Sequence, residues 1–280
     1  MPEAIRGLLI AAQARLSGES VRLESELLLA HALDRPRAWL YAHLDDRPSH
    51  ASSQHFDALI EARAQGRPVA YLLGQREFWS LPLRITPDVL IPRPETERLV
   101  ELALARIDAE GGTEVADLGT GSGAIALAIA HTRPQVRVLA TDVGATALAV
   151  ARDNAVRLGL ANVAFAEGDW CAALGTRRFD LIVSNPPYIR ADDRHLEQGD
   201  LRFEPRAALA SGDDGLDAIR SIVGAASRHL NPGGWLLLEH GAQQGAAVRT
   251  LLVAAGFVNT ETACDLAGHE RVTCASAKRE

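Results

Sequence analysis

The sequence predicts an α/β fold in which a mainly parallel sheet carries helices on both faces. Two observations support this. Beyond residue 112, short apolar runs alternate with amphipathic stretches as far as the C-terminus. A glycine-rich turn at residues 119–123 joins the first apolar run to the first amphipathic stretch. Alternation of strand and helix is typical of a parallel sheet, because each crossover helix returns the chain to the same edge.

Length and composition fit a soluble protein of two domains. The chain has 280 residues, of which 47% are hydrophobic and 23% are charged, values that allow a sizeable core. No apolar run reaches the ~20 residues of a membrane helix. The first sixteen residues carry charged and polar side chains throughout, unlike a signal peptide. We therefore expect a cytoplasmic protein with no membrane contact, and we expect a monomer.

The cysteines and histidines do not form a metal-binding pattern. Cys171, Cys264 and Cys274 are widely spaced, without a C-x-x-C pair, which argues against a disulfide framework or a zinc site. The nine histidines are scattered, so no metal is expected. A net charge of −7 argues against binding that depends on neutralising phosphates, although a local basic patch stays possible.

The N-terminal segment, residues 1–74, is predicted to be a small helical bundle. Apolar residues recur there at helical spacing, as in Ile5, Leu8, Leu9 and Ala12. Serines at positions 20 and 53 are candidate helix starts. Residues 75–94 change to short β-like pieces punctuated by prolines, which indicates a linker that contains a hairpin.

The third segment, residues 95–280, opens with a helix at 95–107, where the apolar residues form one face. Strands and helices then take turns. We expect strands at 115–118, 136–141, 163–166, 179–183 and 234–239, helices at 124–130, 145–158, 215–229 and 242–255, and two last strands near Val258 and Val272.

The glycine-rich turn is a candidate cofactor site. Gly119, Thr120, Gly121, Ser122 and Gly123 follow a predicted strand and open a predicted helix. Glycines at alternate positions let a ligand approach the backbone. Alone, this pattern is compatible with a structural turn or with NAD, FAD or another nucleotide.

Three further residues follow the next two strands. Asp142 ends the second strand, about 20 residues beyond the turn, where a carboxylate can accept both hydroxyls of a ribose. It can equally cap the helix at 145–158, and the two roles are compatible. Asp169 and Trp170 follow the third strand, where an adenine would lie in a doubly wound sheet. Asp169 can accept from an adenine amino group, and Trp170 can supply a ring contact or simply pack.

The fourth strand leads into Asn185-Pro186-Pro187-Tyr188, the most specific signal in the chain. Two consecutive prolines stiffen the backbone at the edge of the sheet where ligands of open α/β folds bind. The Asn185 side-chain oxygen and the Pro186 carbonyl can then each accept one hydrogen of an NH₂ group, so the nitrogen lone pair points at a methyl donor. Tyr188 can stack on the flat amide or base. This tetrapeptide predicts methyl transfer to a planar nitrogen.

Together these residues resemble the HemK/PrmC family of protein-glutamine methyltransferases. The resemblance covers the motifs DLGTGSGAIALA, GDW and SNPPYI, and the stretches REFWSLPL, LIPRPETE, QGDLRFEPRAAL and LLLEHG. It implies a class I, Rossmann-like methyltransferase domain with a seven-stranded sheet, a helical N-terminal domain that helps to dock the substrate protein, and a hairpin linker. The implied cofactor is S-adenosylmethionine, and the implied substrate is the glutamine of the Gly-Gly-Gln loop in bacterial peptide chain release factors.

The resemblance implies cofactor contacts at 119–123, Asp142, Trp170 and Asn185, with the substrate at Asn185 to Tyr188. Two positions depart from the family pattern. Gly144 stands where a polar capping residue is expected, and Ser80 stands where many relatives are expected to have glycine.

Two other functions remain as alternatives. An adenine-N6 DNA or RNA methyltransferase meets the same chemistry at an exocyclic NH₂, but the negative net charge and the lack of a basic stripe in the N-terminal segment count against it. An inactive S-adenosylmethionine-binding regulator needs the glycine turn and Asp142 but not the NPPY tetrapeptide.

Overall fold

The computed structural model describes residues 3–108 and 111–279. The chain divides into two compact units. The helical unit is Met1–Gln75 together with Gln198–Phe203, and the sheet unit is Arg76–Glu197 together with Glu204–Glu280.

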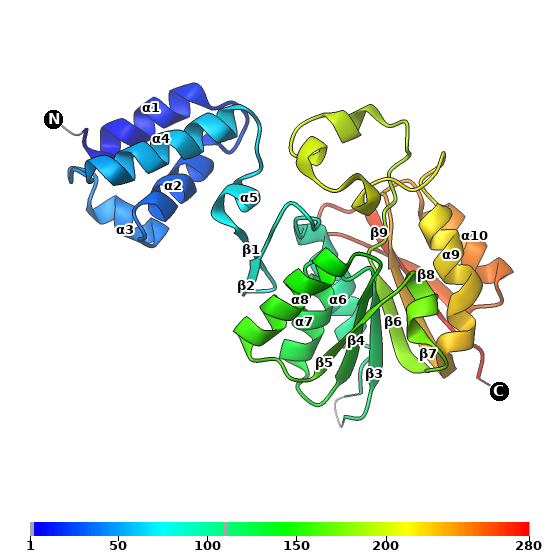
Figure 1. The fold of residues 1–280 in the computed structure, drawn as a ribbon. Coiled ribbons are helices and arrows are strands. Elements are labelled where there is room, and N and C mark those ends of the chain that lie inside the picture. The colour runs from blue at the N-terminus through cyan, green and yellow to red at the C-terminus, as the bar shows by residue number, and fades with distance from the viewer. Residues whose placement is uncertain (1–2, 109–110, 280) are drawn as a thin grey trace. The chain divides into compact units, whose positions relative to one another are not determined.

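The helical unit packs its helices around a small apolar core (Figure 1). Its helices are α1 (Ile5–Arg15), α2 (Val21–Ala32), α3 (Arg37–Ala42), α4 (His50–Ala64) and α5 (Val69–Leu73). The core includes Leu28, Leu29, Leu40, Phe56 and Ile60. The helical spacing of such apolar residues in the sequence is what predicted this bundle.

The two predicted helix starts in this unit differ in outcome. Ser20 precedes α2, but its side chain makes no capping hydrogen bond. Helix α4 begins earlier than predicted, because Ser49 caps it by accepting a hydrogen bond from the Ser52 amide at 3.1 Å. Ser53 therefore lies inside α4, and the prediction of a start there was wrong.

A short segment remote in sequence belongs to the helical unit. The Arg63 guanidinium donates to Glu24 of α2 at 2.8 Å and to Asp200 at 2.8 Å. Arg202 donates to the Gln65 carbonyl at 2.7 Å. These contacts hold residues 198–203 at the C-terminal end of α4. The Arg63 side chain is only 16% exposed, so solvent screens its ion pairs weakly.

The sheet unit is built on seven strands in the order β5-β4-β3-β6-β7-β9-β8. The pairs from β5 to β7 are parallel, and β9 pairs antiparallel with both β7 and β8. This confirms the predicted seven-stranded, mainly parallel sheet. The strands are β3 (Glu114–Leu118), β4 (Arg137–Asp142), β5 (Val163–Glu167), β6 (Phe179–Ser184), β7 (Leu230–Glu239), β8 (Val258–Cys264) and β9 (Glu270–Ser276).

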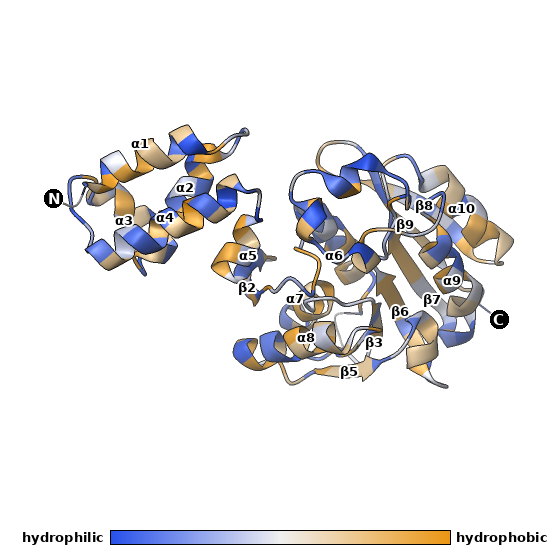
Figure 2. Cartoon of the chain, turned by 45° about the horizontal axis from the view of Figure 1, so that its top comes forward, coloured by the Kyte–Doolittle hydropathy of each residue, from blue (hydrophilic) through white to orange (hydrophobic). Residues whose placement is uncertain are grey.

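Helices cover both faces of this sheet (Figure 1). The α6, α7 and α8 helices pack on one face, and α9 and α10 bury apolar side chains on the other. The central strands are correspondingly hydrophobic in Figure 2, as expected for a sheet buried on both sides. The helices are α6 (Glu97–Leu104), α7 (Ala124–Thr132), α8 (Ala145–Leu158), α9 (Asp217–Ala226) and α10 (Gly245–Ala254), with short 3₁₀ turns η1 (Pro94–Thr96) and η2 (Trp170–Leu174).

A two-stranded hairpin, β1 (Gln75–Phe78) and β2 (Leu81–Arg84), precedes the sheet. Both turn residues have positive φ, 53° at Trp79 and 59° at Ser80. A two-residue turn with φ above zero at both positions matches the right-handed twist of the strands and favours glycine or asparagine. The positive φ at Ser80 therefore explains why a glycine is expected at this position in relatives.

Candidate functional site

The glycine-rich turn lies at the carboxyl end of β3, directly before α7. Gly119, Gly121 and Gly123 all have positive φ, between 57° and 87°, which residues with a side chain rarely adopt. A Cβ at Gly119 would lie 3.0 Å from the Trp170 ring, whereas one at Gly121 would meet no atom within 4 Å. The turn therefore packs against Trp170 at one glycine and opens into free space at the next.

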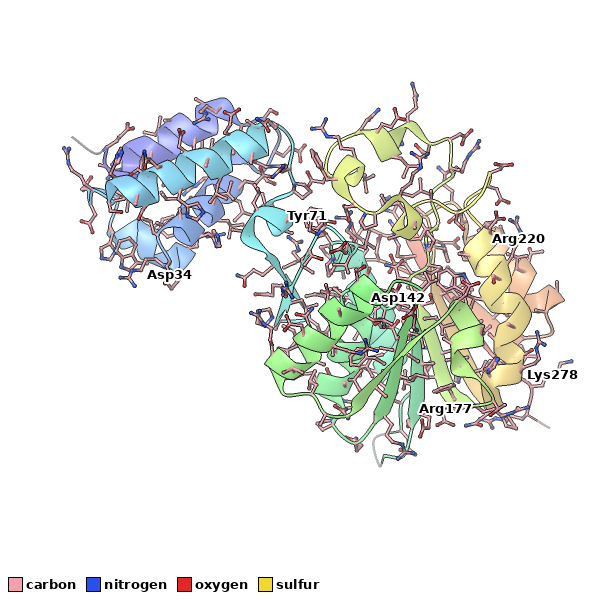
Figure 3. All side chains as sticks on the ribbon, in the orientation of Figure 1. Asp34, Tyr71, Asp142, Arg177, Arg220 and Lys278 are labelled. Atoms are coloured by element: carbon pink, nitrogen blue, oxygen red, sulfur yellow. The ribbon has the colours of Figure 1, made fainter. Side chains whose placement is uncertain are left out.

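Asp142 at the end of β4 holds this turn in place. Its Oδ2 accepts from the Gly121 amide at 2.9 Å, and its Oδ1 accepts from the Gly144 amide at 2.8 Å. An ionised carboxylate has about four acceptor positions, so two remain for a ligand. Figure 3 shows Asp142 at the edge of the sheet opposite Arg177 and Lys278, which is the edge formed by the carboxyl ends of the parallel strands.

One cavity collects residues from four strand ends. Gly119, Gly121, Asp142, Asp169, Trp170, Asn185 and Pro187 line it together. All seven were candidates from the sequence alone. They come from the segments after β3, β4, β5 and β6, which the parallel topology brings to one edge.

The remaining candidates do not line this cavity. Thr120 is buried and donates its hydroxyl hydrogen to Asp117 at 2.7 Å. Ser122 is buried, and its carbonyl accepts from Asn154 at 2.9 Å. Gly123 is buried against Leu127 and Ala151. These three residues therefore support the turn through contacts with the protein interior and not with the cavity.

Pro186 and Tyr188 also lie outside the lining of the cavity. Pro186 is buried. The half-buried Tyr188 donates its hydroxyl hydrogen to Glu239 Oε1 at 3.3 Å. Burial raises the pKa of Tyr188, and the nearby Glu239 carboxylate raises it further, so this hydroxyl stays protonated.

Several lining residues were not predicted. Asp88, Val89 and Leu90 come from the linker, and Pro205, Ala207 and Ala208 come from the loop before α9. Glu204 anchors that loop, because its buried carboxylate accepts from the Ile91 amide at 3.0 Å and pairs with Arg93. The stretches LIPRPETE and QGDLRFEPRAAL, which carry these residues, are the signal that could have identified them.

A buried carboxylate lies beneath the glycine turn. Asp117 Oδ2 accepts from Thr120 and from the Ala126 amide at 3.2 Å, while Oδ1 has no hydrogen-bond partner in the described part of the chain. Burial raises the pKa of Asp117 to about 7, against the hydrogen bonds from Thr120 and Ala126.

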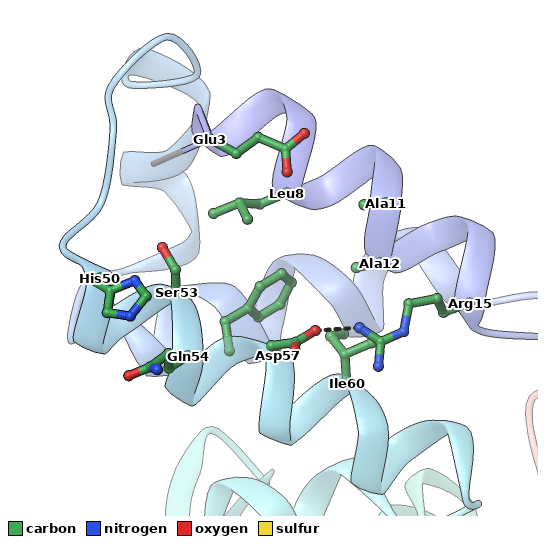
Figure 4. Close-up of a pocket in the computed structure, with 11 residues that line it drawn as sticks. Glu3, Leu8, Ala11, Ala12, Arg15, His50, Ser53, Gln54, Asp57 and Ile60 are labelled. Carbon is green, nitrogen blue, oxygen red and sulfur yellow. Dashed lines mark hydrogen bonds and ion pairs between the residues drawn. The ribbon is translucent and has the colours of Figure 1, made fainter. Parts of the chain in front are cut away.

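A second cavity lies within the helical unit, between α1 and α4 (Figure 4). Leu8, Ala12, Phe56 and Ile60 give it an apolar floor, and an ion pair between Arg15 and Asp57 crosses one end.

Two features of residues 3–108 and 111–279 bear on the class of site. Within these ranges, no group of three or more histidine, cysteine or acidic side chains is arranged to hold a metal ion. No helix there combines the length and the apolar character that crossing a membrane requires.

The fold and the cavity define a class of protein, the Rossmann-like methyltransferases. Residues 98–200 match the family model described as "Methyltransferase small domain". A methyltransferase from Pyrococcus furiosus superposes with a TM-score of 0.55 at 18% identity, over 79% of this chain and 98% of that one. The hMettl16 catalytic domain, in complex with a 3'UTR hairpin, superposes with a TM-score of 0.58 at 17% identity, over 78% and 81% of the two chains. At these identities the likeness concerns the fold.

The chain belongs to the release factor glutamine methyltransferase family. Residues 8–74 match the family model described as "PrmC N-terminal domain". Release factor glutamine methyltransferases from Xylella fastidiosa, Vibrio cholerae and Escherichia coli are 57%, 48% and 46% identical to it. The alignments cover 98%, 96% and 92% of this chain, and 98%, 94% and 92% of the respective relatives.

Proposed function

We propose that this enzyme transfers a methyl group from S-adenosylmethionine to the side-chain amide nitrogen, N5, of the glutamine in the Gly-Gly-Gln loop of bacterial release factors. The observation that carries the proposal is the single cavity in which the glycine turn and Asp142 meet Asn185 and Pro187. The proposed cofactor site and the proposed site for a planar NH₂ group therefore lie next to each other in one cavity.

The residues of the cavity suit the cofactor. Gly121 leaves open space where a side chain would otherwise stand, and Asp142 keeps acceptor positions for two ribose hydroxyls. Asp169 and Trp170 line the part of the cavity that we assign to the adenine. When bound, S-adenosylmethionine supplies a methyl group on a cationic sulfonium.

The NPPY tetrapeptide orients the nucleophile. In our proposal, the Asn185 Oδ1 and the Pro186 carbonyl each accept one hydrogen of the glutamine NH₂, so that its lone pair faces the cofactor side of the cavity. Tyr188 packs on the amide plane. The proton that the nitrogen loses after methylation passes to water, so the reaction needs no strong general base.

The helical unit is proposed to dock the substrate protein. Its match to the family's N-terminal model and the cavity between α1 and α4 support this role. Leu8→Glu on the cavity floor should raise the KM for a release factor several-fold while the cofactor Kd stays unchanged, with circular dichroism as a check that the helices persist. A protein partner of this kind fits a cytoplasmic enzyme that acts as a monomer.

Intact-mass spectrometry tests the proposed function directly. A recombinant release factor incubated with the enzyme and S-adenosylmethionine should gain one methyl group, located by fragmentation on the glutamine of the Gly-Gly-Gln loop. Changing that glutamine to alanine should abolish the gain, and DNA or RNA in the same assay should stay at background. Methylation of adenine without methylation of the release factor would assign the enzyme to nucleic acid instead.

A further inference from the structure

A buried pair of residues stands behind the proposed substrate site, and none of the roles assigned so far uses it. Glu239 ends β7, next to the β6 end that leads into Asn185, and its side chain is fully buried. Thr96 ends η1 and is 3% exposed. The Asn185 Nδ2 donates to the Thr96 Oγ1 at 3.2 Å, and the Tyr188 hydroxyl donates to Glu239 Oε1.

The Thr96 hydroxyl links the two halves of this cluster. Burial raises the pKa of Glu239 to about 7, and the nearby Thr96 hydroxyl acts in the opposite direction. Glu239 Oε2 is buried and has no hydrogen-bond partner among the described residues. A buried acceptor without a partner is costly, so the Thr96 hydroxyl beside it is the donor available to satisfy it.

When Glu239 is ionised, only one order of donors and acceptors gives every group in this cluster a partner. An ionised carboxylate only accepts hydrogen bonds, and a hydroxyl carries one hydrogen. If Thr96 gives that hydrogen to Glu239, its oxygen can only accept from Asn185. The Asn185 amide must then turn its NH₂ toward Thr96 and its Oδ1 away from it, toward the cavity that Asn185 lines.

We infer that Glu239 and Thr96 are positioning residues, which fix the orientation of the Asn185 amide so that its oxygen, and not its NH₂ group, faces the substrate. The inference deepens the proposed function and rests on it, because the substrate NH₂ needs an acceptor at this point. With the amide reversed, two NH₂ groups would face each other and the substrate nitrogen could not be held.

The sharpest variant is Glu239→Gln, which keeps the size and removes the charge. Its amide can donate to Thr96, which frees the threonine hydrogen for Asn185 Oδ1 and allows the reversed orientation. We expect kcat to fall by about tenfold or more, which is less than the ~10²–10³ cost of removing a preorganised group outright. Calorimetry should find the cofactor Kd within about twofold of wild type, since Asp142 and the glycine turn are untouched.

Variants of Thr96 distinguish the effect of its hydroxyl group from the effect of its side-chain size. Thr96→Val keeps the shape and loses the hydrogen bonds, so it should lower kcat about as much as Glu239→Gln, whereas Thr96→Ser should restore most of it. Thr132→Val is the matched control, because Thr132 also uses its hydroxyl in two hydrogen bonds, to Trp79 and Ala128, away from the cavity.

A double-mutant cycle decides between positioning and a general structural role. If Glu239 acts through Asn185, adding Glu239→Gln to Asn185→Ala should cause no further loss of kcat. Additive losses, or wild-type kcat in both Glu239→Gln and Thr96→Val, would overturn the inference. An inactive wild-type enzyme would instead overturn the proposed function, so the two failures are distinguishable.

Discussion

Asp142 accepts a hydrogen bond from the Gly121 amide through one oxygen and from the Gly144 amide through the other, and it also lines the cavity. At the scale of single residues, one carboxylate thus supports the glycine turn and is also our proposed cofactor ligand. The capping role considered from the sequence takes an unexpected form, since the bond goes to Gly144, which itself precedes α8, and not to an amide inside the helix.

We predict that Asp142→Ala weakens cofactor binding by about tenfold or more, because a charge-assisted hydrogen bond contributes about 1.5–3 kcal/mol. Isothermal titration calorimetry with S-adenosylmethionine measures this directly. Asp153→Ala is the control, since Asp153 is a carboxylate that pairs with Arg84 and does not line the cavity. Equal affinities for the Asp142 variant and wild type would remove Asp142 from the cofactor site.

Asn185→Ala is expected to reduce turnover by on the order of 10² or more, because one preorganised acceptor is lost. Cofactor affinity should change far less, since Asn185 is one of many residues that line the cavity. Single-turnover transfer of a labelled methyl group to the release factor checks the rate, and calorimetry checks the affinity. A near-normal rate would mean that the amide is not the acceptor.

The residues that follow strand ends could be predicted from the sequence, and those that act through tertiary contacts could not. Asp142, Trp170 and Asn185 each follow an apolar run, and the parallel topology brings such positions to one edge. Thr96 and Glu239 lie in stretches noted for family likeness, LIPRPETE and LLLEHG, but nothing in their spacing indicates that their side chains meet. Only the folded structure brings the Thr96 side chain close to Glu239.

At the scale of elements, regular segments were predicted closely and irregular ones less so. The helix at 145–158 coincides with α8, because its apolar spacing is uninterrupted and Gly159 ends it in a left-handed conformation. The helix predicted at 95–107 is shorter, since Pro94 to Thr96 form a 3₁₀ turn and α6 ends at Leu104. Proline and short-range capping decide such boundaries.

The hairpin turn offers a test at this scale. Ser80→Gly should raise the free energy of unfolding by about 1 kcal/mol, because a residue with a Cβ loses about that much in a left-handed conformation. Urea titration followed by circular dichroism measures the change. Ser221→Gly, inside α9, should do the opposite by a similar amount. Destabilisation by Ser80→Gly would mean that the Ser80 side chain contributes more than its backbone conformation costs.

At the scale of the whole molecule, two fully buried carboxyl groups make stability depend on pH. Burial raises the pKa of both Asp117 and Glu239 to about 7, above the usual ~4 of an unfolded chain. Between these values the native protein binds more protons than the unfolded chain, so rising pH lowers stability. Their contribution is complete below about pH 4 and is lost as the pH passes 7.

Asp117→Asn isolates this effect, because asparagine stays neutral at every pH. Relative to wild type, the variant should become more stable between pH 5 and pH 8, with a slope of up to about 1.4 kcal/mol per pH unit. The comparison cancels groups with the opposite trend, such as His240, whose pKa burial lowers. Urea unfolding at the two pH values gives the slope, and parallel curves would show that Asp117 ionises normally in the folded protein.

The helical unit is not one continuous piece of the chain, and this limits how the gene can be recombined. Residues 198–203 belong to it through Asp200 and Arg202, although they are encoded within the part that carries the sheet. A single crossover near residue 75 between two diverged relatives would therefore separate Arg63 from the acidic partner with which it is matched. A chimera that exchanges the N-terminal segment should keep its own 198–203 loop with it, and substitutions at these two places are expected to be inherited together.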